Sequence, residues 1–242
     1  MDSALHEFVQ TKEIPIFGIA TADGFEHALP GLHPKELMPA CKSVVIFGRP
    51  YVKHPFHVDE ETHIADESWW TANEVVYRDL AAWRGELVNF FDGFGLGVAN
   101  FGGFVLTTEP TFAYRLAQYE AGLGVYGRFG ICLTPDFGCY YHVGVLLTEA
   151  ALIPSDKGSL RGFEPCDGCS LCAEACPVRA IDVSKAPAKG YNRELCAKFI
   201  LKLRQRYDRD ADLYPQDAKI CARSFSACPW AGRAPAFAAE MR

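Results

Sequence analysis

The sequence has no apolar run approaching the roughly eighteen residues that a membrane-spanning helix needs. Its first residues, "MDSALHEFVQTKEIPIFG", lack the basic and apolar segments of a secretory signal peptide. It also contains no repeat and no low-complexity tract. These absences predict a folded cytoplasmic protein with no membrane partner.

Positive charge is scarce as well. The 24 lysines and arginines are outnumbered by 30 aspartates and glutamates, which gives a formal net charge of -6. Such a chain has no general attraction to phosphate backbones or anionic lipids, so nucleic acid is not the expected main partner. With 242 residues, 49% of them hydrophobic, the chain is long enough for one large domain or for two unequal ones.

The cysteines are unevenly distributed along the sequence. Of the ten cysteines, only Cys41, Cys132 and Cys139 lie in the first two thirds, and seven fall between positions 166 and 228. In a reducing compartment such clustering indicates metal ligation rather than disulfides. A segment rich in proline, glycine and serine, 153–165, precedes the dense region. We therefore predict two domains, 1–157 and 158–242.

The first domain shows mixed α/β patterning. Residues 43–51 form an apolar strand pattern, and 71–91 form a long amphipathic helix that a Thr71–Glu74 capping box would open. A second helix is predicted over 110–121, followed by two strands around the turn 135–138. The later strand is apolar on both faces and is therefore expected in the middle of the sheet.

The segment "CDGCSLCAEACP" carries the strongest chemical signal. It places Cys166, Cys169, Cys172 and Cys176 in the spacing C-x2-C-x2-C-x3-C-P of bacterial ferredoxins, in which the fourth cysteine ligates a second cluster. Cys228 is also followed by proline, so we expect it to complete the first 4Fe-4S cluster with Cys166, Cys169 and Cys172. A zinc site is the alternative, because C-x2-C pairs also bind zinc.

The second cluster would use Cys176, Cys196 and Cys221, and it lacks an obvious fourth cysteine. The mirrored spacing requires one at position 224, where the sequence has Ser224, a harder donor than thiolate. Three alternatives follow: a 3Fe-4S cluster on three cysteines, a 4Fe-4S cluster with Ser224 or an exogenous ligand, or no second cluster.

Two other motifs have simple explanations. The segment "GLGVYG", starting at Gly122, matches the dinucleotide pattern G-x-G-x-x-G, but it follows a predicted helix instead of opening one. Gly122 is therefore predicted to cap that helix. The segment "YVKHPFHVDEETH" contains His54, His57 and His63, which could bind a metal or line a substrate entrance. Its polarity predicts a solvated loop instead.

Together these glycines, the hairpin after them and the cysteine run resemble the cobalamin-dependent epoxyqueuosine reductases and the related reductive dehalogenases. The residues that carry the resemblance are "AGLGVYGRFGICLTPDFGCYYHVGVLLTE", "CDGCSLCAEACPVRAID", "ELCAKFI" and "CPW", with a weaker match in "LMPACKSVVIFGRPY".

The resemblance implies a nitroreductase-like α/β (α+β) domain that binds cobalamin, followed by a ferredoxin-like iron-sulfur domain. Electrons from a low-potential donor such as ferredoxin or flavodoxin would pass through the clusters to cobalt. A small molecule would then be reduced there, with cleavage of a C–O or C–halogen bond. The residues expected along the corrinoid are Gly122, Gly124, Gly127, Arg128, Gly138, Tyr140 and Tyr141, and Tyr141 is also a candidate catalytic residue.

The sequence departs from the family at the catalytic acid. An aspartate precedes the glycine turn in epoxyqueuosine reductases, and the corresponding position here is Thr108. The neighbouring Glu109 is the substitute candidate, although it could equally cap the helix that Pro110 would begin. The sequence also ends soon after the clusters, which we take as an argument against a tRNA substrate. The alternative function is a non-catalytic protein that transfers electrons or delivers a corrinoid, and the first domain could also bind flavin or nothing.

Overall fold

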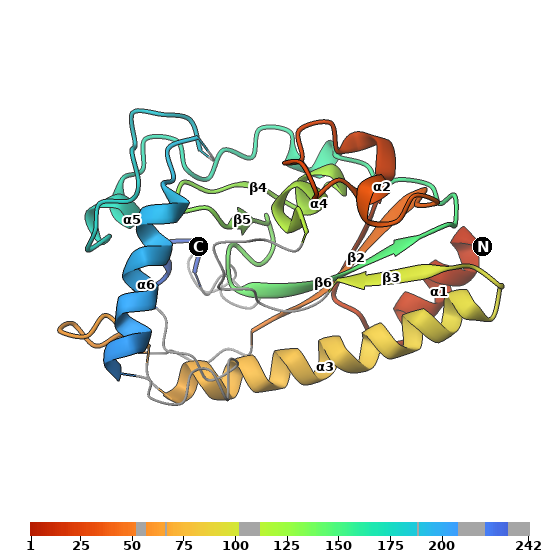
Figure 1. Ribbon diagram of the computed structural model, residues 1–242, viewed down its shortest axis with the longest axis horizontal. Helices are drawn as coiled ribbons and strands as arrows, with labels where there is room; N and C mark the ends of the chain where they lie inside the picture. The colour runs from red at the N-terminus through yellow and green to blue at the C-terminus, as the bar shows by residue number, and fades with distance from the viewer. Residues whose placement is uncertain (52–56, 66, 102–111, 188, 208–220, 232–242) are drawn as a thin grey trace, which may run out of the picture.

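The computed structural model describes residues 1–51, 57–65, 67–101, 112–187, 189–207 and 221–231. Its regular elements follow one another in the order shown in Figure 1. The helices are α1 (Asp2–Thr11), α2 (Pro34–Leu37), α3 (Glu67–Asp92), α4 (Tyr114–Glu120), α5 (Leu171–Glu174), α6 (Arg193–Tyr207) and α7 (Arg223–Ser226), with short 3-10 turns at Ala22–Gly24 and Gly158–Leu160. The strands are β1 (Ile16–Thr21), β2 (Ser43–Pro50), β3 (Val98–Phe101), β4 (Val125–Tyr126), β5 (Cys132–Leu133) and β6 (Tyr141–Thr148).

The main sheet is antiparallel and has the strand order β1-β2-β6-β3. Its two central strands, β2 and β6, are the ones that the sequence predicted as apolar. Successive side chains of a strand point to opposite faces, so Val45 and Phe47 lie on one face and Val44 and Ile46 on the other. Each face is therefore buried under its own layer.

Helix α3 covers one face of the sheet along most of its length, together with α1 (Figure 1). Of the predicted apolar stripe, Val76, Leu80, Leu87 and Phe91 are buried. The helix begins at Glu67, so the capping box predicted at Thr71 is wrong. The additional turn brings Trp69 against Tyr51 and Tyr140, and burial of this aromatic group explains the earlier start.

Helix α4 covers the opposite face, where Leu116 and Ala117 pack with β1 and β2. The predicted start of this helix at Pro110 lies outside the described residues. Its end is as predicted, because Gly122 has a φ of 69°. The amide of Leu123 donates to the carbonyl of Gln118 at 2.9 Å and that of Gly122 to Tyr119 at 3.0 Å. This is a Schellman cap, so the glycine motif ends a helix and does not open one.

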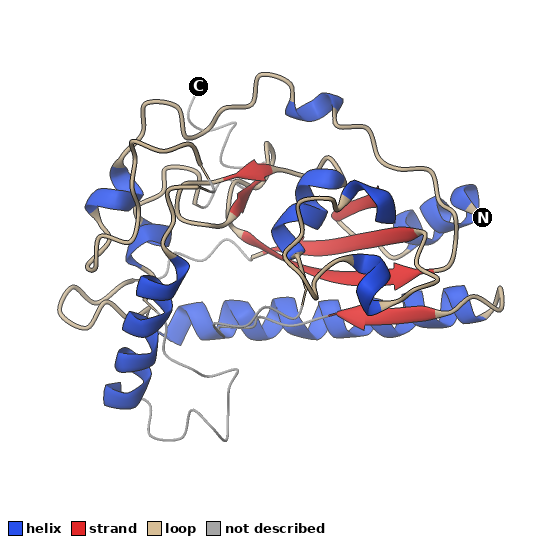
Figure 2. Ribbon diagram, turned by 45° about the horizontal axis from the view of Figure 1, so that its top comes forward, coloured by secondary structure: helices blue, strands red, loops and turns tan. Residues whose placement is uncertain are grey.

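The cysteine-rich end of the chain looks different. Figure 2 shows that it is built mostly from loops, with α6 as its longest helix. Before this end, residues 153–157 still bond to the sheet layer, since the amide of Ser155 donates to Ile19 at 2.9 Å and that of Ile153 donates to Asp2 at 2.7 Å. The domain boundary after residue 157 stays a prediction. No helix in the described ranges is long and apolar enough to span a membrane.

Candidate iron-sulfur site

The first predicted cluster site forms a single pocket. Cys166, Cys169 and Cys172 line it together with Cys228, which approaches from the distant CPW segment. The other lining residues are Arg128, Phe129, Pro165, Pro229 and Trp230. The structure thus brings together all four residues that the sequence assigned to this cluster.

The chemistry of this pocket fits a cluster of iron and sulfide. Burial, together with the neighbouring thiols, raises the pKa of the Cys172 thiol to about 11. Four ionised thiolates could not coexist there without cations, and iron would supply them. In the described part of the chain, no three His, Cys, Asp or Glu side chains converge to hold one metal ion. Thiols set around a pocket suit a cluster better than a single zinc ion.

Arg128 holds the first of these cysteines in place. Its backbone amide donates to the Cys166 sulfur, and its Nε donates to the Cys166 carbonyl at 3.2 Å. The guanidinium also donates to the carbonyls of Val183 at 3.0 Å and Lys185 at 2.9 Å. Arg128 was predicted along the corrinoid, and in the structure it clamps the iron-sulfur region to the β4–β5 turn.

A fifth cysteine lies beside this pocket. Cys139 is buried in the same apolar cluster as Cys172 and Cys228, and its thiol is hydrogen-bonded to the Cys228 sulfur. This hydrogen bond, followed by burial, raises the pKa of Cys139 well above its ordinary value, so Cys139 keeps its proton and donates. The proline after Cys228 predicted its place at the cluster, but no sequence spacing links Cys139 to the cysteine run, so its position was not predicted.

The second predicted site gathers three thiols. Cys221 is an electrostatic neighbour of Cys196 and Cys176, although burial is the main cause that raises its pKa to about 11. The Cys176 sulfur accepts from the amide of Ala180 at 3.3 Å, and Cys196 accepts from the Tyr191 hydroxyl. Such donors stabilise ligating thiolates. The hydroxyl of Ser224 is turned elsewhere and donates to the Cys172 carbonyl at 3.0 Å.

The glycines predicted along a corrinoid are packed against the protein itself. A Cβ added to Gly122 would lie 2.5 Å from the carbonyl oxygen of Asp156, and one at Gly124 would lie 2.5 Å from that of Leu133. At Gly127 the same test gives 2.8 Å to the Ile131 oxygen, and at Gly138 the carbonyl of Trp230 fills the space. These contacts explain the glycines without a bound macrocycle.

The two tyrosines are buried. Tyr140 packs against Tyr51, Trp69 and Phe225. The Tyr141 hydroxyl donates to Gln118, with the carbonyl oxygen of Cys132 at 3.2 Å, and burial raises its pKa well above the ordinary value. It therefore ties β6 to α4 and β5 in this structure. Glu109 and Thr108 lie outside the described residues.

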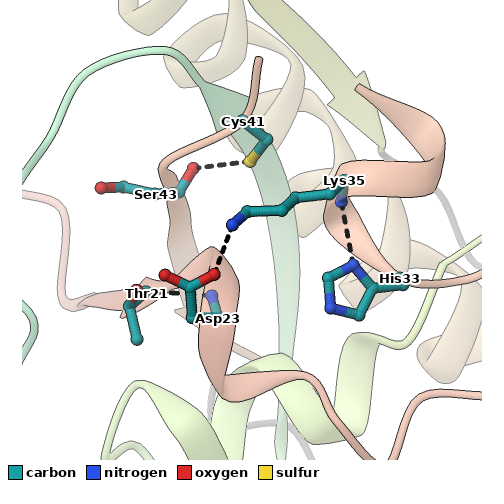
Figure 3. A network of polar contacts seen from close by, with 6 residues as sticks. All are labelled: Thr21, Asp23, His33, Lys35, Cys41 and Ser43. Atoms are coloured by element: carbon teal, nitrogen blue, oxygen red, sulfur yellow. Dashed lines mark hydrogen bonds and ion pairs between the residues drawn. The ribbon is translucent and has the colours of Figure 1, made fainter. Parts of the chain in front are cut away.

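Cys41, Cys132 and His142 take no part in either cysteine group. Cys41 lies beside α2, near the ion pair of Lys35 with Asp23, and its thiol donates to the carbonyl of Ser43 at 3.4 Å (Figure 3). Cys132 is buried and donates to the carbonyl of Arg115 at 3.4 Å. His142 packs edge-on against Tyr77, and burial lowers its pKa to about 4.

Comparison with known proteins supports this description. Residues 163–182 match the family described as a 4Fe-4S binding domain. The tetrachloroethene reductive dehalogenase of Sulfurospirillum multivorans is 29% identical over 112 residues, which cover 46% of this chain and 22% of the dehalogenase. The epoxyqueuosine reductase of Francisella cf. novicida is 25% identical over 174 residues, 69% of this chain and 46% of the reductase. This chain is homologous to both enzymes. The matched region therefore spans less than half of either relative.

Solved structures share the fold. An epoxyqueuosine reductase from Bacillus subtilis aligns with a TM-score of 0.63 at 17% identity, covering 94% of this chain and 65% of that one. A structure described as suggesting a mechanism for B12-dependent dehalogenation aligns with a TM-score of 0.54 at 19% identity, covering 76% and 27%. The fold is thus a mixed α/β fold with a 4Fe-4S region, and the predicted resemblance to both groups of proteins is confirmed.

Proposed function

We propose that this chain is an oxidoreductase that carries low-potential electrons through two iron-sulfur clusters to a corrinoid, where a small molecule is reduced with cleavage of a C–O or C–halogen bond. The observation that carries the proposal is the pocket in which Cys228 meets Cys166, Cys169 and Cys172. This crossed arrangement is that of a two-cluster ferredoxin. The homologous enzymes are reductases.

The protein's own residues suggest the direction of electron flow. The second group of thiols lies around α6 and the Cys221 segment, where Cys176, Cys196 and Cys221 are all partly exposed. In the first group, Cys172 and Cys228 are buried, and Cys228 contacts Cys139 in the loop that leads into β6. Electrons from a ferredoxin or flavodoxin would therefore enter at the second cluster and leave from the first towards the sheet domain.

The corrinoid part of the proposal is supported by the relatives. A bound corrinoid would supply a cobalt centre able to reduce substrates at low potential. The predicted glycines, Arg128 and both tyrosines already have partners within the chain, so their contacts do not mark a corrinoid surface. For this reason we assign no reaction step to any of these residues.

The proposed substrate classes come from the names of the related proteins. The matched curated proteins include both dehalogenases and epoxyqueuosine reductases. One solved epoxyqueuosine reductase that shares the fold was determined with a tRNA-Tyr stem loop, with a TM-score of 0.61. The predicted exclusion of tRNA therefore lacks support, and a tRNA stem loop belongs among the substrates to be tested. The cytoplasmic location also stays a prediction.

A second candidate is a non-catalytic protein that passes electrons, or a corrinoid, to a partner enzyme. The observation that favours it is the filled space at Gly122, Gly124, Gly127 and Gly138. In this case the chain would contain reducible clusters and would turn over no substrate alone.

One experiment separates these candidates. Anaerobic electron paramagnetic resonance would be recorded on the reconstituted protein before and after addition of cob(II)alamin, with free cob(II)alamin as the control. Loss of the axial-nitrogen splitting from the cobalt signal supports a bound, base-off corrinoid. A cobalt signal identical to that of the free cofactor, beside intact cluster signals, would reject corrinoid binding and leave the electron carrier.

When binding is observed, turnover is measured next, with reduced flavodoxin, a chlorinated alkene and an epoxyqueuosine-modified tRNA stem loop. Product from either substrate supports the oxidoreductase. Bound corrinoid without product from either one favours the delivery protein.

A further inference from the structure

The second group of thiols lacks one ligand. Cys176, Cys196 and Cys221 are mutual neighbours, but a cubane with four iron atoms needs four ligands from its surroundings. All three sulfurs accept hydrogen bonds, from the Ala180 amide, the Tyr191 hydroxyl and the Arg223 amide. The group is therefore built for ligation except at one position.

Ser224 does not fill this position in the structure. Its hydroxyl donates a hydrogen bond to the carbonyl of Cys172 at 3.0 Å. A serine that ligates iron does so as an alkoxide, which has no proton to donate. The observed hydrogen bond and ligation by Ser224 thus exclude each other, and a different residue must be sought.

His63 lies in a separate segment, next to the two segments that carry Cys196 and Cys221. Its carbonyl accepts from the amide of Ala222 at 3.2 Å, and the next residue, Ile64, pairs with Cys221 in an antiparallel bridge. Its ring lies 6.0 Å from that of Phe199, which follows Cys196 by three residues on α6 and shares its side of the helix.

The side chain of His63 has an unused nitrogen. Nδ1 is buried and has no hydrogen-bond partner within the described part of the chain. The backbone is also unusual, with a φ of 64°, and the His63 amide donates to the carbonyl of Asp59 at 2.9 Å. A buried unpaired nitrogen and a left-handed backbone are both unfavourable, so their combination at one residue suggests a function. The segment is exposed at residues 57 and 59–61, as predicted for a solvated loop, whereas His63 is partly buried.

We propose that His63 is the fourth ligand of the second cluster, which it would bind through Nδ1. Neutral imidazole is a good iron ligand, and ligation would give the orphaned nitrogen its partner. Exchange of one thiolate for a neutral imidazole removes a negative charge from the cluster, which raises its reduction potential. The second cluster would then have a higher potential than the same cluster with four thiolate ligands. This inference rests on the iron-sulfur part of the proposed function and is independent of the corrinoid.

The first test uses the unaltered sequence. The protein would be produced with 15N-labelled histidine, reconstituted anaerobically and reduced, and pulsed electron paramagnetic resonance would be recorded on the cluster signals. The expected result is a strong 15N coupling on one of the two clusters. Absence of a histidine nitrogen coupling, or absence of a second cluster, would overturn the proposal. Neither result depends on whether cob(II)alamin binds.

Variants then assign the coupling to His63. His63→Ala should lose about one iron atom per chain, give the signal of an oxidised 3Fe cluster and abolish the 15N coupling. His63→Cys should keep the iron and shift the potential of the second cluster to more negative values. His27→Ala, which removes an exposed histidine elsewhere, should change none of these readouts.

Ser224 provides the opposing test. When His63 is the ligand, Ser224→Cys leaves the iron content unchanged. Gain of iron in Ser224→Cys, or full iron and an unchanged coupling in His63→Ala, would show that His63 does not ligate the cluster.

Discussion

The sheet domain and the cysteine-rich end are stabilised by different means. In the sheet domain, two large groups of buried apolar side chains lie on either face of β2 and β6. The group around the cysteines contains six buried residues, and three of these are Cys139, Cys172 and Cys228. The regular elements of this end are short, apart from α6, and burial is the main cause that raises the pKa values of Cys172 and Cys221.

The two halves depend on their surroundings in different ways. Burial of apolar surface stabilises the sheet without any cofactor. The cysteine-rich end has too small a core for this and needs the energy of metal ligation, as small metal-binding domains generally do.

Removal of iron should act on one half only. An anaerobic chelator would remove iron from the cysteine ligands. The buried thiols would then repel one another when ionised, and the surrounding loops would open. Hydrogen exchange followed by mass spectrometry should show lost protection over 163–182 and 193–207, with protection of β2 and β6 retained. Uniform loss across both regions would show that the sheet also depends on the clusters.

Substitution of single cysteines should affect the iron content differently in the two halves. Cys228→Ala removes a predicted ligand that is distant in sequence, so the first cluster should be lost, with about four iron atoms per chain. Cys41→Ala is the matched control, because Cys41 is also buried but its hydrogen bonds are to the backbone of Ser43 and Thr148, away from the cysteine pocket (Figure 3). Iron analysis and the visible spectrum would measure both. Equal iron in the two variants would contradict the crossed arrangement.

A substitution in the sheet core should lower stability without changing the iron content. Phe47 is fully buried in the sheet core, where its ring lies over Gly144, so Phe47→Ala should lower the free energy of unfolding by about 3–5 kcal/mol. The iron content per folded chain should not change. Denaturant unfolding followed by tyrosine and tryptophan fluorescence would measure this effect. Loss of iron in chains that remain folded would show that the two halves are coupled more closely than their cores suggest.

Acid should destabilise the sheet domain through His142. Burial lowers the pKa of His142 to about 4, whereas an unfolded histidine titrates near 6.5. The unfolded chain binds the additional proton between these values, so stability is full above about pH 6.5 and falls as the pH drops towards 4. Because the residue is partly exposed, we expect a loss of roughly 2–3 kcal/mol. His142→Gln should flatten this slope in unfolding curves measured at several pH values, and an unchanged slope would refute the assignment.

The smallest expected effect concerns Cys139, which joins the two halves. Its S–H donates to Cys228 and should stabilise the more negative, reduced cluster. If the hydrogen bond stabilises the reduced cluster over the oxidised one by about 1 kcal/mol, Cys139→Ala lowers the reduction potential of the first cluster by on the order of 40 mV. A redox titration followed by electron paramagnetic resonance would measure it, with Cys132→Ala as the control for a buried thiol outside the cluster. A potential unchanged in Cys139→Ala would mean that this contact does not tune the cluster.

Much of this molecule could be predicted because its signals are local. Apolar alternation identified β2 and β6, the helical period identified α3, and a glycine after α4 marked its end. Predictions were wrong where contacts between distant residues set the structure. At the start of α3, for example, packing of Trp69 on Tyr51 and Tyr140 overrides the predicted Thr71 cap. The role of Arg128 was also beyond prediction, since its partners lie in a different part of the chain.

By itself, the sequence determined the cysteine spacing, and spacing within one short run dictates which sulfurs can surround a common cluster. Only the tertiary structure decided which residues from distant segments lie beside that cysteine run. It brought Cys228 and Cys139 to the first group, turned Ser224 towards Cys172, and placed His63 beside Cys221 with an unpaired nitrogen. The physical reason is that ligands from separate segments are positioned by packing and backbone pairing, and neither has a signature in local residue order.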